Sequence, residues 1–211
     1  MFDFTKEEVS LFRKLNSPKK IQDFLNAIPT NFEDDGETVL SPRQVLKERR
    51  AHCMEGAMLA AAILRFHGYP PLVVDLTATK IDEDHVVTVF KQNGHWGAVS
   101  KSNHATLRYR EPVYKTIREL VMSYFHEYYT GKEGIKTLRS YAGPINLAKF
   151  DNKGWMTSNE DVWYIPDYLE KVPHKEIMSR SQIARLRRAD EVELRAGKTV
   201  EWEKEACQKT S

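Results

Sequence analysis

The feature that most constrains the fold is an almost wholly apolar stretch, CMEGAMLAAAILRF, which runs from Cys53 to about Phe66. Gly68 and Pro70 follow it, and residues of these types end helices. Small residues near its start, Gly56 among them, keep the helix thin, so that strands can approach its backbone closely. We therefore expect a buried helix that begins at a cysteine and packs against a sheet.

Three strands are expected directly after this helix. The segment PLVVDLTA (71–78) is rich in β-branched residues, and HVVTVFKQ (85–92) continues that pattern. An Asn-Gly pair then gives a tight hairpin signal before HWGAVS (95–100). The order of helix, strand and hairpin predicts an α+β fold with a small antiparallel sheet.

Further helices are expected on both sides of this region. Each has apolar residues at helical spacing, and the first begins with a capping box formed by Thr5 and Glu8. After Thr130 the pattern weakens, and the segments GPINLAKF and DVWYI are expected as short strands or ordered loops. The expected helices cover residues 5–16, 17–28, 41–50 and 114–129.

The 211 residues are expected to form one domain at 1–174, with its core at 41–130, and a charged helical extension at 175–211. Hydrophobic residues make up 41% of the chain and charged residues 29%, as in an ordinary globular protein. The formal net charge of +2 gives no reason to expect nucleic acid or a membrane as partner. The basic run SRSQIARLRR is followed at once by ADEVELRAG, which indicates balanced charge on a helix surface. Nothing in the sequence indicates the oligomeric state.

Cellular location bears on the state of the two cysteines, Cys53 and Cys207. No apolar run approaches the roughly 20 residues that a bilayer requires. The first residues, MFDFTKEEVS, lack the apolar core of a signal peptide, so we expect a cytoplasmic protein. A disulfide between the two cysteines is the less favoured alternative, since reduced thiols are the rule in that compartment. We expect no cofactor.

The position of Cys53 favours chemistry over simple packing. A helix N-terminus stabilises an anion, and a thiolate there has a lowered pKa. His85 opens the second expected strand, where its side chain can face the start of the helix and take a proton. A residue near the end of the third strand would then orient the imidazole. This is the general pattern of nucleophilic cysteine catalysis.

The order of these residues resembles the transglutaminase-like superfamily, which shares the papain-like cysteine protease architecture. The resemblance covers about Ser41 to Asn103 and rests on AHCMEGAMLAAAILRFHGYPPLVVD, DHVVTVF and GHWGAVS. Upstream, IQDFLNAIPTNFE resembles the lead-in helix of bacterial members. The resemblance implies acyl transfer or hydrolysis at an amide of a peptide, a protein or a small molecule.

By this likeness Cys53 matches the nucleophile and His85 the base. The orienting aspartate of the family should follow the motif W-x-x-V, but Ser100 stands there. Asn103 is the second candidate for orienting His85, and Asp84, beside His85, is a weaker one. The backbone N–H of Cys53 would contribute to an oxyanion hole.

Substrate binding is predicted for three residues near the hairpin, Trp96, Arg108 and Arg110. The arginines can hold an anionic group of a substrate, and the alternative is that they pair with Glu111 or Glu119.

Other interpretations of the cysteine and its neighbours stay open. Cys53 can be a core residue, or the domain can be a catalytically inactive binding or scaffolding module. Zinc ligands can come from Cys53, His85 and His104, or from His52 with His95, but no short paired spacing supports either set. His52 is expected to face away from Cys53, since adjacent helix positions do not share a face.

Overall fold

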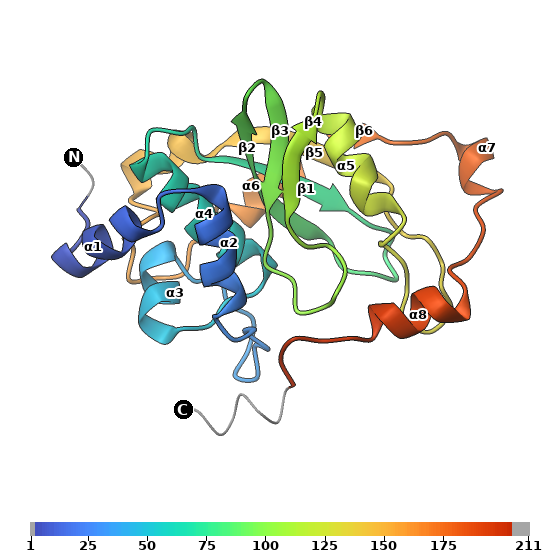
Figure 1. Ribbon diagram of the computed structural model, residues 1–211, viewed down its shortest axis with the longest axis horizontal. Helices are drawn as coiled ribbons and strands as arrows, with labels where there is room; N and C mark the ends of the chain where they lie inside the picture. Colours follow the sequence, from blue (N-terminus) through green and yellow to red (C-terminus); the bar gives the residue numbers. More distant parts are fainter. Residues whose placement is uncertain (1–2, 204–211) are drawn as a thin grey trace.

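The computed structural model describes residues 3–203, which form an α+β fold around a six-stranded antiparallel sheet (Figure 1). The strand order is β4-β3-β2-β1-β5-β6, and every neighbouring pair is antiparallel. The strands are β1 (Leu72–Thr77), β2 (His85–Gln92), β3 (His95–Val99), β4 (Arg110–Tyr114), β5 (Ser140–Asn146) and β6 (Lys175–Glu176).

One face of the sheet is covered by the apolar helix α4 (Cys53–Phe66), as its composition predicts. Side chains of Val73 and Val86 pack against α4, and the Thr88 hydroxyl donates a hydrogen bond to the carbonyl of Ala57 in α4. Every residue of α4 from 54 to 64 is buried. Its other side is covered by the N-terminal helices α1 (Lys6–Lys14), α2 (Pro18–Asn26) and α3 (Pro42–Glu48).

The opposite face of the sheet packs against α5 (Ile117–Phe125). Because side chains alternate along a strand, Val74 and Val87 point to this face while their neighbours point to α4. Leu120 and Tyr124 of α5 complete this second core, so the central strands are buried on both faces.

The predicted N-terminal helices, the Cys53 helix and the hairpin are confirmed, including the capping box of Thr5 and Glu8. The helix expected at 114–129 is shorter, because Tyr114 belongs to β4 and α5 covers Ile117–Phe125. The sheet is larger than the three predicted strands, because β4 and β6 were not expected and β5 overlaps GPINLAKF, which was expected as a short strand or an ordered loop. Residues 110–114 pair with β3 at one edge, and residues 140–146 lie beside β1 near the middle of the sheet. The segment DVWYI forms turns rather than a strand and leads into α6 (Pro166–Lys171).

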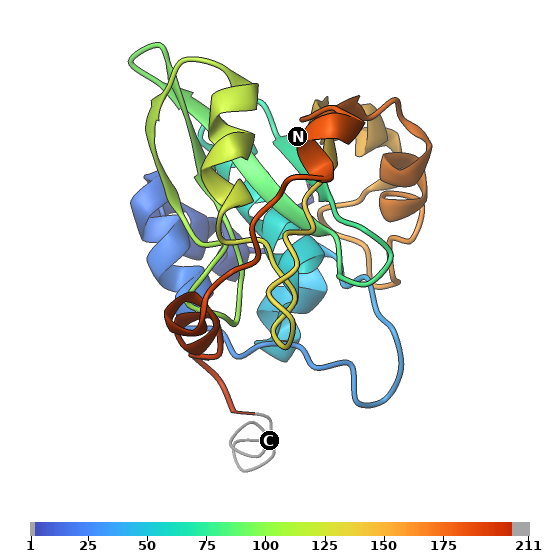
Figure 2. The same cartoon turned by 90° about the vertical axis from the view of Figure 1, so that its right-hand side faces the viewer.

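The charged C-terminal region returns to the body of the molecule (Figure 2). After β6, the helices α7 (Arg180–Ile183) and α8 (Glu191–Gly197) follow, and the Tyr129 hydroxyl donates to the carbonyl of Glu193 at 2.5 Å. A 3-10 helix, η1 (Leu147–Lys153), joins β5 to the turns before α6. Cys207 lies outside the described residues.

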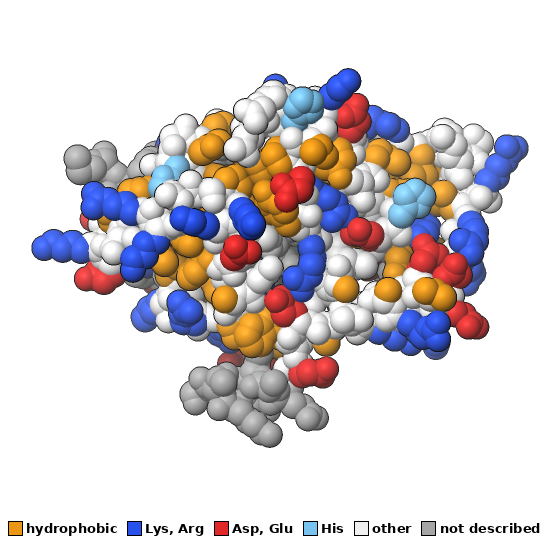
Figure 3. Space-filling model, viewed as in Figure 1, with side chains coloured by type: hydrophobic (Ala, Val, Ile, Leu, Met, Phe, Trp, Pro, Cys, Tyr) orange, Lys and Arg blue, Asp and Glu red, His pale blue; other side chains and the backbone are white. Residues whose placement is uncertain are grey.

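The distribution of surface charge and the length of the helices bear on which partners the protein can bind. Lys and Arg side chains gather over α1 to α3 at the left of Figure 3 and mix with acids toward α8. Within residues 3–203, no helix has the length and apolar character that crossing a bilayer requires.

Candidate active site

Cys53 is the first residue of α4, and it is half-buried. His52 is the N-cap residue, and its Nδ1 atom lies 3.2 Å from the backbone N of Met54. The four leading N–H groups of a helix have no partner within it, so the Cys53 N–H is available to an oxygen in front of the helix. The thiol thus lies at the positive end of α4.

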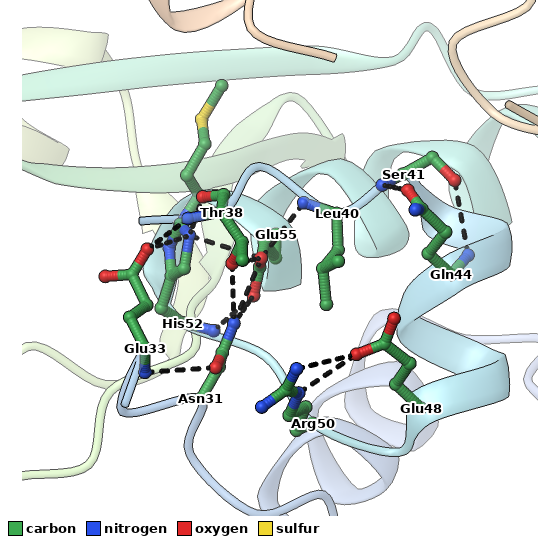
Figure 4. Close-up of polar contacts among 11 residues, drawn as sticks. Asn31, Glu33, Thr38, Leu40, Ser41, Gln44, Glu48, Arg50, His52 and Glu55 are labelled. Carbon is green, nitrogen blue, oxygen red and sulfur yellow. Dashed lines mark hydrogen bonds and ion pairs between the residues drawn. The ribbon is translucent and has the colours of Figure 1, made fainter. Parts of the chain in front are cut away.

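A buried carboxylate fixes the approach to this helix end (Figure 4). Glu55 is fully buried, and both of its carboxylate oxygens accept hydrogen bonds. Its oxygens accept from the backbone N of His52 at 2.9 Å and that of Leu40 at 3.0 Å. They also accept from the Thr38 hydroxyl at 2.8 Å and the Asn31 amide at 3.1 Å. Glu55 therefore ties the loop at 31–40 and the N-cap to α4.

The His85 ring is held by Ser100, the residue that follows β3. His85 Nε2 lies 2.8 Å from Ser100 Oγ, and Ser100 Oγ donates to the carbonyl of Leu107 at 2.6 Å. A hydroxyl has only one hydrogen, so Ser100 must accept from His85. Nε2 therefore carries a hydrogen, and Nδ1 is the atom left to contact Cys53.

Two imidazoles act on the thiol. Burial by itself raises the pKa of Cys53, but hydrogen bonds to His52 and His85 and the charges of both rings lower it to about 5. Burial also lowers the pKa of His52, but the hydrogen bond to Cys53 and the charges of Glu55 and Cys53 raise it to about 9. The two pKa shifts depend on each other, and the surroundings of Cys53 favour its thiolate.

Cys53 opens into a cavity of about 480 Å³. His52 and His85 line it beside the thiol, and Tyr128 and Leu107 lie on its wall. Thr30 also lines it, and the Thr30 Oγ1 atom has no hydrogen-bond partner within residues 3–203. The cavity is large enough for a side chain or a short segment of a substrate.

Of the two residues expected to orient His85, Ser100 is the one bonded to it. Asn103 lines the same cavity but does not orient His85, because both ends of its amide are used by the C-terminal segment. Its Nδ2 donates to the carbonyl of Trp202 at 3.0 Å, and its Oδ1 accepts from the Trp202 N–H at 2.8 Å. Asp84 also lines the cavity, and its Oδ1 accepts from the Ala78 N–H at 2.7 Å.

The three residues expected to bind substrate do not line the cavity. Trp96 packs beside the α5 core, with the Lys91 ammonium 5.5 Å from its ring centre. Arg108 pairs with Glu201 at 2.8 Å. Arg110 pairs with Glu127 at 2.6 Å and lies over the Tyr124 ring. The arginines thus have acidic partners, as in the alternative considered, but not Glu111 or Glu119.

Sequence reasoning placed His52 wrongly. Adjacent positions of a helix diverge, but His52 is the N-cap, and its extended backbone (φ −90°, ψ −174°) brings its ring near Cys53. Its spacing of three from Glu55, as in a capping box, was the available signal. Among the residues that the structure describes, no group of three potential ligands is arranged to hold a metal ion.

Comparison with known proteins does not assign this chain to a family. A scan against models of protein families finds no match, and a search among curated proteins finds none either.

Proposed function

We propose that this chain is a thiol-dependent acyltransferase or amidase, with Cys53 as nucleophile and His85 as base. The observation that carries the proposal is the hydrogen bond between His85 and Ser100, from which the tautomer of His85 follows. Ser100 accepts the Nε2 hydrogen, which leaves a basic nitrogen for the thiol of a cysteine whose pKa is lowered to about 5. Such a thiolate is a nucleophile at neutral pH.

The reaction has two steps. The Cys53 thiol gives its proton to His85 Nδ1, and the sulfur attacks the acyl carbon. The C–N bond of the amide then breaks, the leaving amine departs with the proton from His85, and a thioester remains. Water or a second amine then attacks the thioester, His85 accepts its proton, and the sulfur leaves as thiolate. The Cys53 N–H, at the start of α4, is the candidate donor to the oxyanion.

We also propose a transglutaminase-like core. A buried helix that starts at the cysteine, packed on antiparallel strands with the histidine at the start of β2, supports that resemblance. The substrate we propose is an amide of a peptide, a protein or a small molecule.

A second candidate function is a catalytically inactive binding module. It is favoured by the neutral partner of His85, because a serine hydroxyl stabilises an imidazolium less than a carboxylate does.

Reaction with an activated ester separates the two candidates. A Cys207→Ser protein is mixed with excess p-nitrophenyl acetate, and phenolate release and protein mass are followed. The enzyme is expected to give a burst, one acetyl group on Cys53, and continued turnover that added amine accelerates. Acetylation that stops after one equivalent indicates the inactive module, and a Cys53→Ser protein gives the background. Acetylation no faster than that of the unfolded chain contradicts both a reactive thiol and the enzyme.

A further inference from the structure

We infer that Gln22, a buried residue of α2, is a positioning residue that acts on His85 through Ser100. The inference rests on the proposed function of Cys53 and His85. Gln22 contacts Ser100 through the backbone alone: Oε1 accepts from the Ser100 N–H at 2.9 Å, and Nε2 donates to the Ser100 carbonyl at 2.8 Å. Gln22 does not line the cavity around Cys53, so it has no direct part in the chemistry.

Ser100 needs this support because it lies one residue beyond the end of β3. The pairing of β3 with β2 ends at Val99, so the Ser100 peptide groups no longer belong to the regular ladder of the sheet. The carboxamide of Gln22 offers one acceptor and one donor side by side, as a neighbouring strand would. It thereby fixes the backbone from which the Ser100 hydroxyl reaches His85.

The orientation of the Gln22 amide is determined by its partners. Nε2 has two hydrogens, of which one goes to the Ser100 carbonyl and the other to Asn26 Oδ1 at 2.8 Å. If the amide oxygen and nitrogen were exchanged, the amide NH₂ would face the Ser100 N–H, so that two donors would meet. The amide oxygen would face Asn26 Oδ1, so that two acceptors would meet. The hydrogen bonds of the Gln22 amide are therefore consistent with one orientation of its side chain.

A second contact from the next residue ties the same segment to α2. The buried Lys101 ammonium donates to the carbonyls of Leu25 and Ile28, at 3.1 and 2.5 Å, beside the end of that helix. The position of the Ser100 hydroxyl is thus set by α2, an element that is distant from Cys53 in the sequence. In this arrangement a neutral hydroxyl orients His85 because the segment that carries it is tied to α2 through both Ser100 and Lys101.

The inference predicts an effect of Gln22 on the state of His85. Gln22→Glu keeps the size and the acceptor but loses the donor to the Ser100 carbonyl, and Gln22→Met loses both. The control is Ile21→Val, which removes a methylene group from the same buried face of α2 without touching Ser100. All are made in a Cys207→Ser chain, and Cys53 is alkylated with iodoacetamide across a pH series.

The alkylation midpoint of both Gln22 variants is expected to rise by about one pH unit, a tenfold loss of thiolate at low pH, while Ile21→Val keeps the wild-type midpoint. Folded Gln22 variants with the wild-type midpoint overturn the inference. If the wild-type thiol itself titrates as an ordinary cysteine, it is the proposed function that fails.

A measurement that needs no Gln22 variant covers the case in which those proteins do not fold. In a Cys53→Ala chain at alkaline pH, where imidazoles are neutral, nitrogen-15 spectra of labelled histidine report the tautomer. His85, assigned by its loss in His85→Gln, is expected to carry its hydrogen on Nε2. A hydrogen on Nδ1 contradicts the chain of contacts from Gln22 through Ser100 to His85.

Discussion

Ser100 is fully buried and uses one hydroxyl for two contacts, because it donates to Leu107 and accepts from His85. The resemblance to transglutaminase-like proteins leads one to expect an aspartate at this position. A carboxylate can accept from His85, but it has no hydrogen for the Leu107 carbonyl, and it would carry a charge into the buried site. The surroundings of Ser100 are therefore built for a hydroxyl.

We predict that Ser100→Asp does not create a better site. Repulsion between the carboxylate and the Leu107 carbonyl is expected to lower the free energy of unfolding by about 3 kcal/mol, and Ser100→Ala is expected to cost about 1–2 kcal/mol. Urea unfolding measures both. An aspartate protein as stable as the wild type contradicts this account of the hydroxyl.

Glu55 allows a second prediction at this scale. Its carboxylate only accepts, whereas the amide of Glu55→Gln presents two hydrogens to groups that are themselves donors. The substitution is expected to lower the free energy of unfolding by about 3 kcal/mol. The matched control is Glu48→Gln, whose ion pair with Arg50 is exposed, so its cost should stay within about 0.5 kcal/mol. Equal effects of the two substitutions would count against the role of Glu55.

At the scale of elements, the site depends on a close approach between α4 and the segment after β3. A Cβ built on Gly56 would overlap the Cβ of Lys101. The missing side chain in the first turn of α4 thus lets Ser100 and Lys101 pass close to Cys53. Small residues in this helix were expected to serve approaching strands, and at Gly56 the approach is made by the segment that leaves β3.

Replacing glycine by alanine inside a helix usually raises the free energy of unfolding by about 1 kcal/mol. Gly56→Ala is expected to lower it instead. Overlap with Lys101 is expected to destabilise the protein by about 2 kcal/mol and to slow alkylation of Cys53 at neutral pH. Gly131→Ala is the control for stability, since nothing lies within 4 Å of its added Cβ. A Gly56→Ala protein that is more stable than the wild type would refute the close approach.

The elements that could be predicted are those with local signals. The caps of Thr5 and Glu8, the apolar run of α4 and the Asn-Gly turn are encoded within a few residues. The β4 and β5 strands carry weaker patterns, since each contains a proline. No residue of β4 is buried, and only the first three residues of β5 are. They exist because β3 and β1 offer them unpaired edges, which depends on the whole sheet.

At the scale of the whole molecule, the C-terminal segment completes one wall of the cavity. Thr199 accepts from the Ala105 N–H at 2.9 Å, and the Glu201 N–H donates to Asn103 at 2.8 Å. Gly197 itself lines the cavity. Such contacts join residues about a hundred positions apart, and no local pattern could have assigned Asn103 to them rather than to His85.

Asn103→Ala tests this assignment. Loss of both amide contacts with Trp202 is expected to loosen the segment after Gly197, so that limited proteolysis there becomes several times faster. The alkylation midpoint of Cys53 is expected to remain at its wild-type value, because Asn103 does not hold His85. A raised alkylation midpoint of Cys53 would instead indicate that Asn103 orients His85.

The pairing of Cys53 with His85 was predicted from position and residue type, and the structure places both side chains at one cavity. The role of His52 and the support from Gln22 could not be predicted. The first depends on the extended backbone of an N-cap, and the second on a contact that spans 78 positions.

The central claim is that the folded protein holds Cys53 as a thiolate beside two imidazoles. The most direct test is the rate of iodoacetamide alkylation of a Cys207→Ser protein between about pH 4 and pH 10, with the urea-unfolded chain as reference. Because folding lowers the pKa of Cys53, the folded protein is expected to reach half of its plateau rate near pH 5. An alkylation midpoint of the folded protein equal to that of the unfolded chain, about pH 8.5, would contradict the claim.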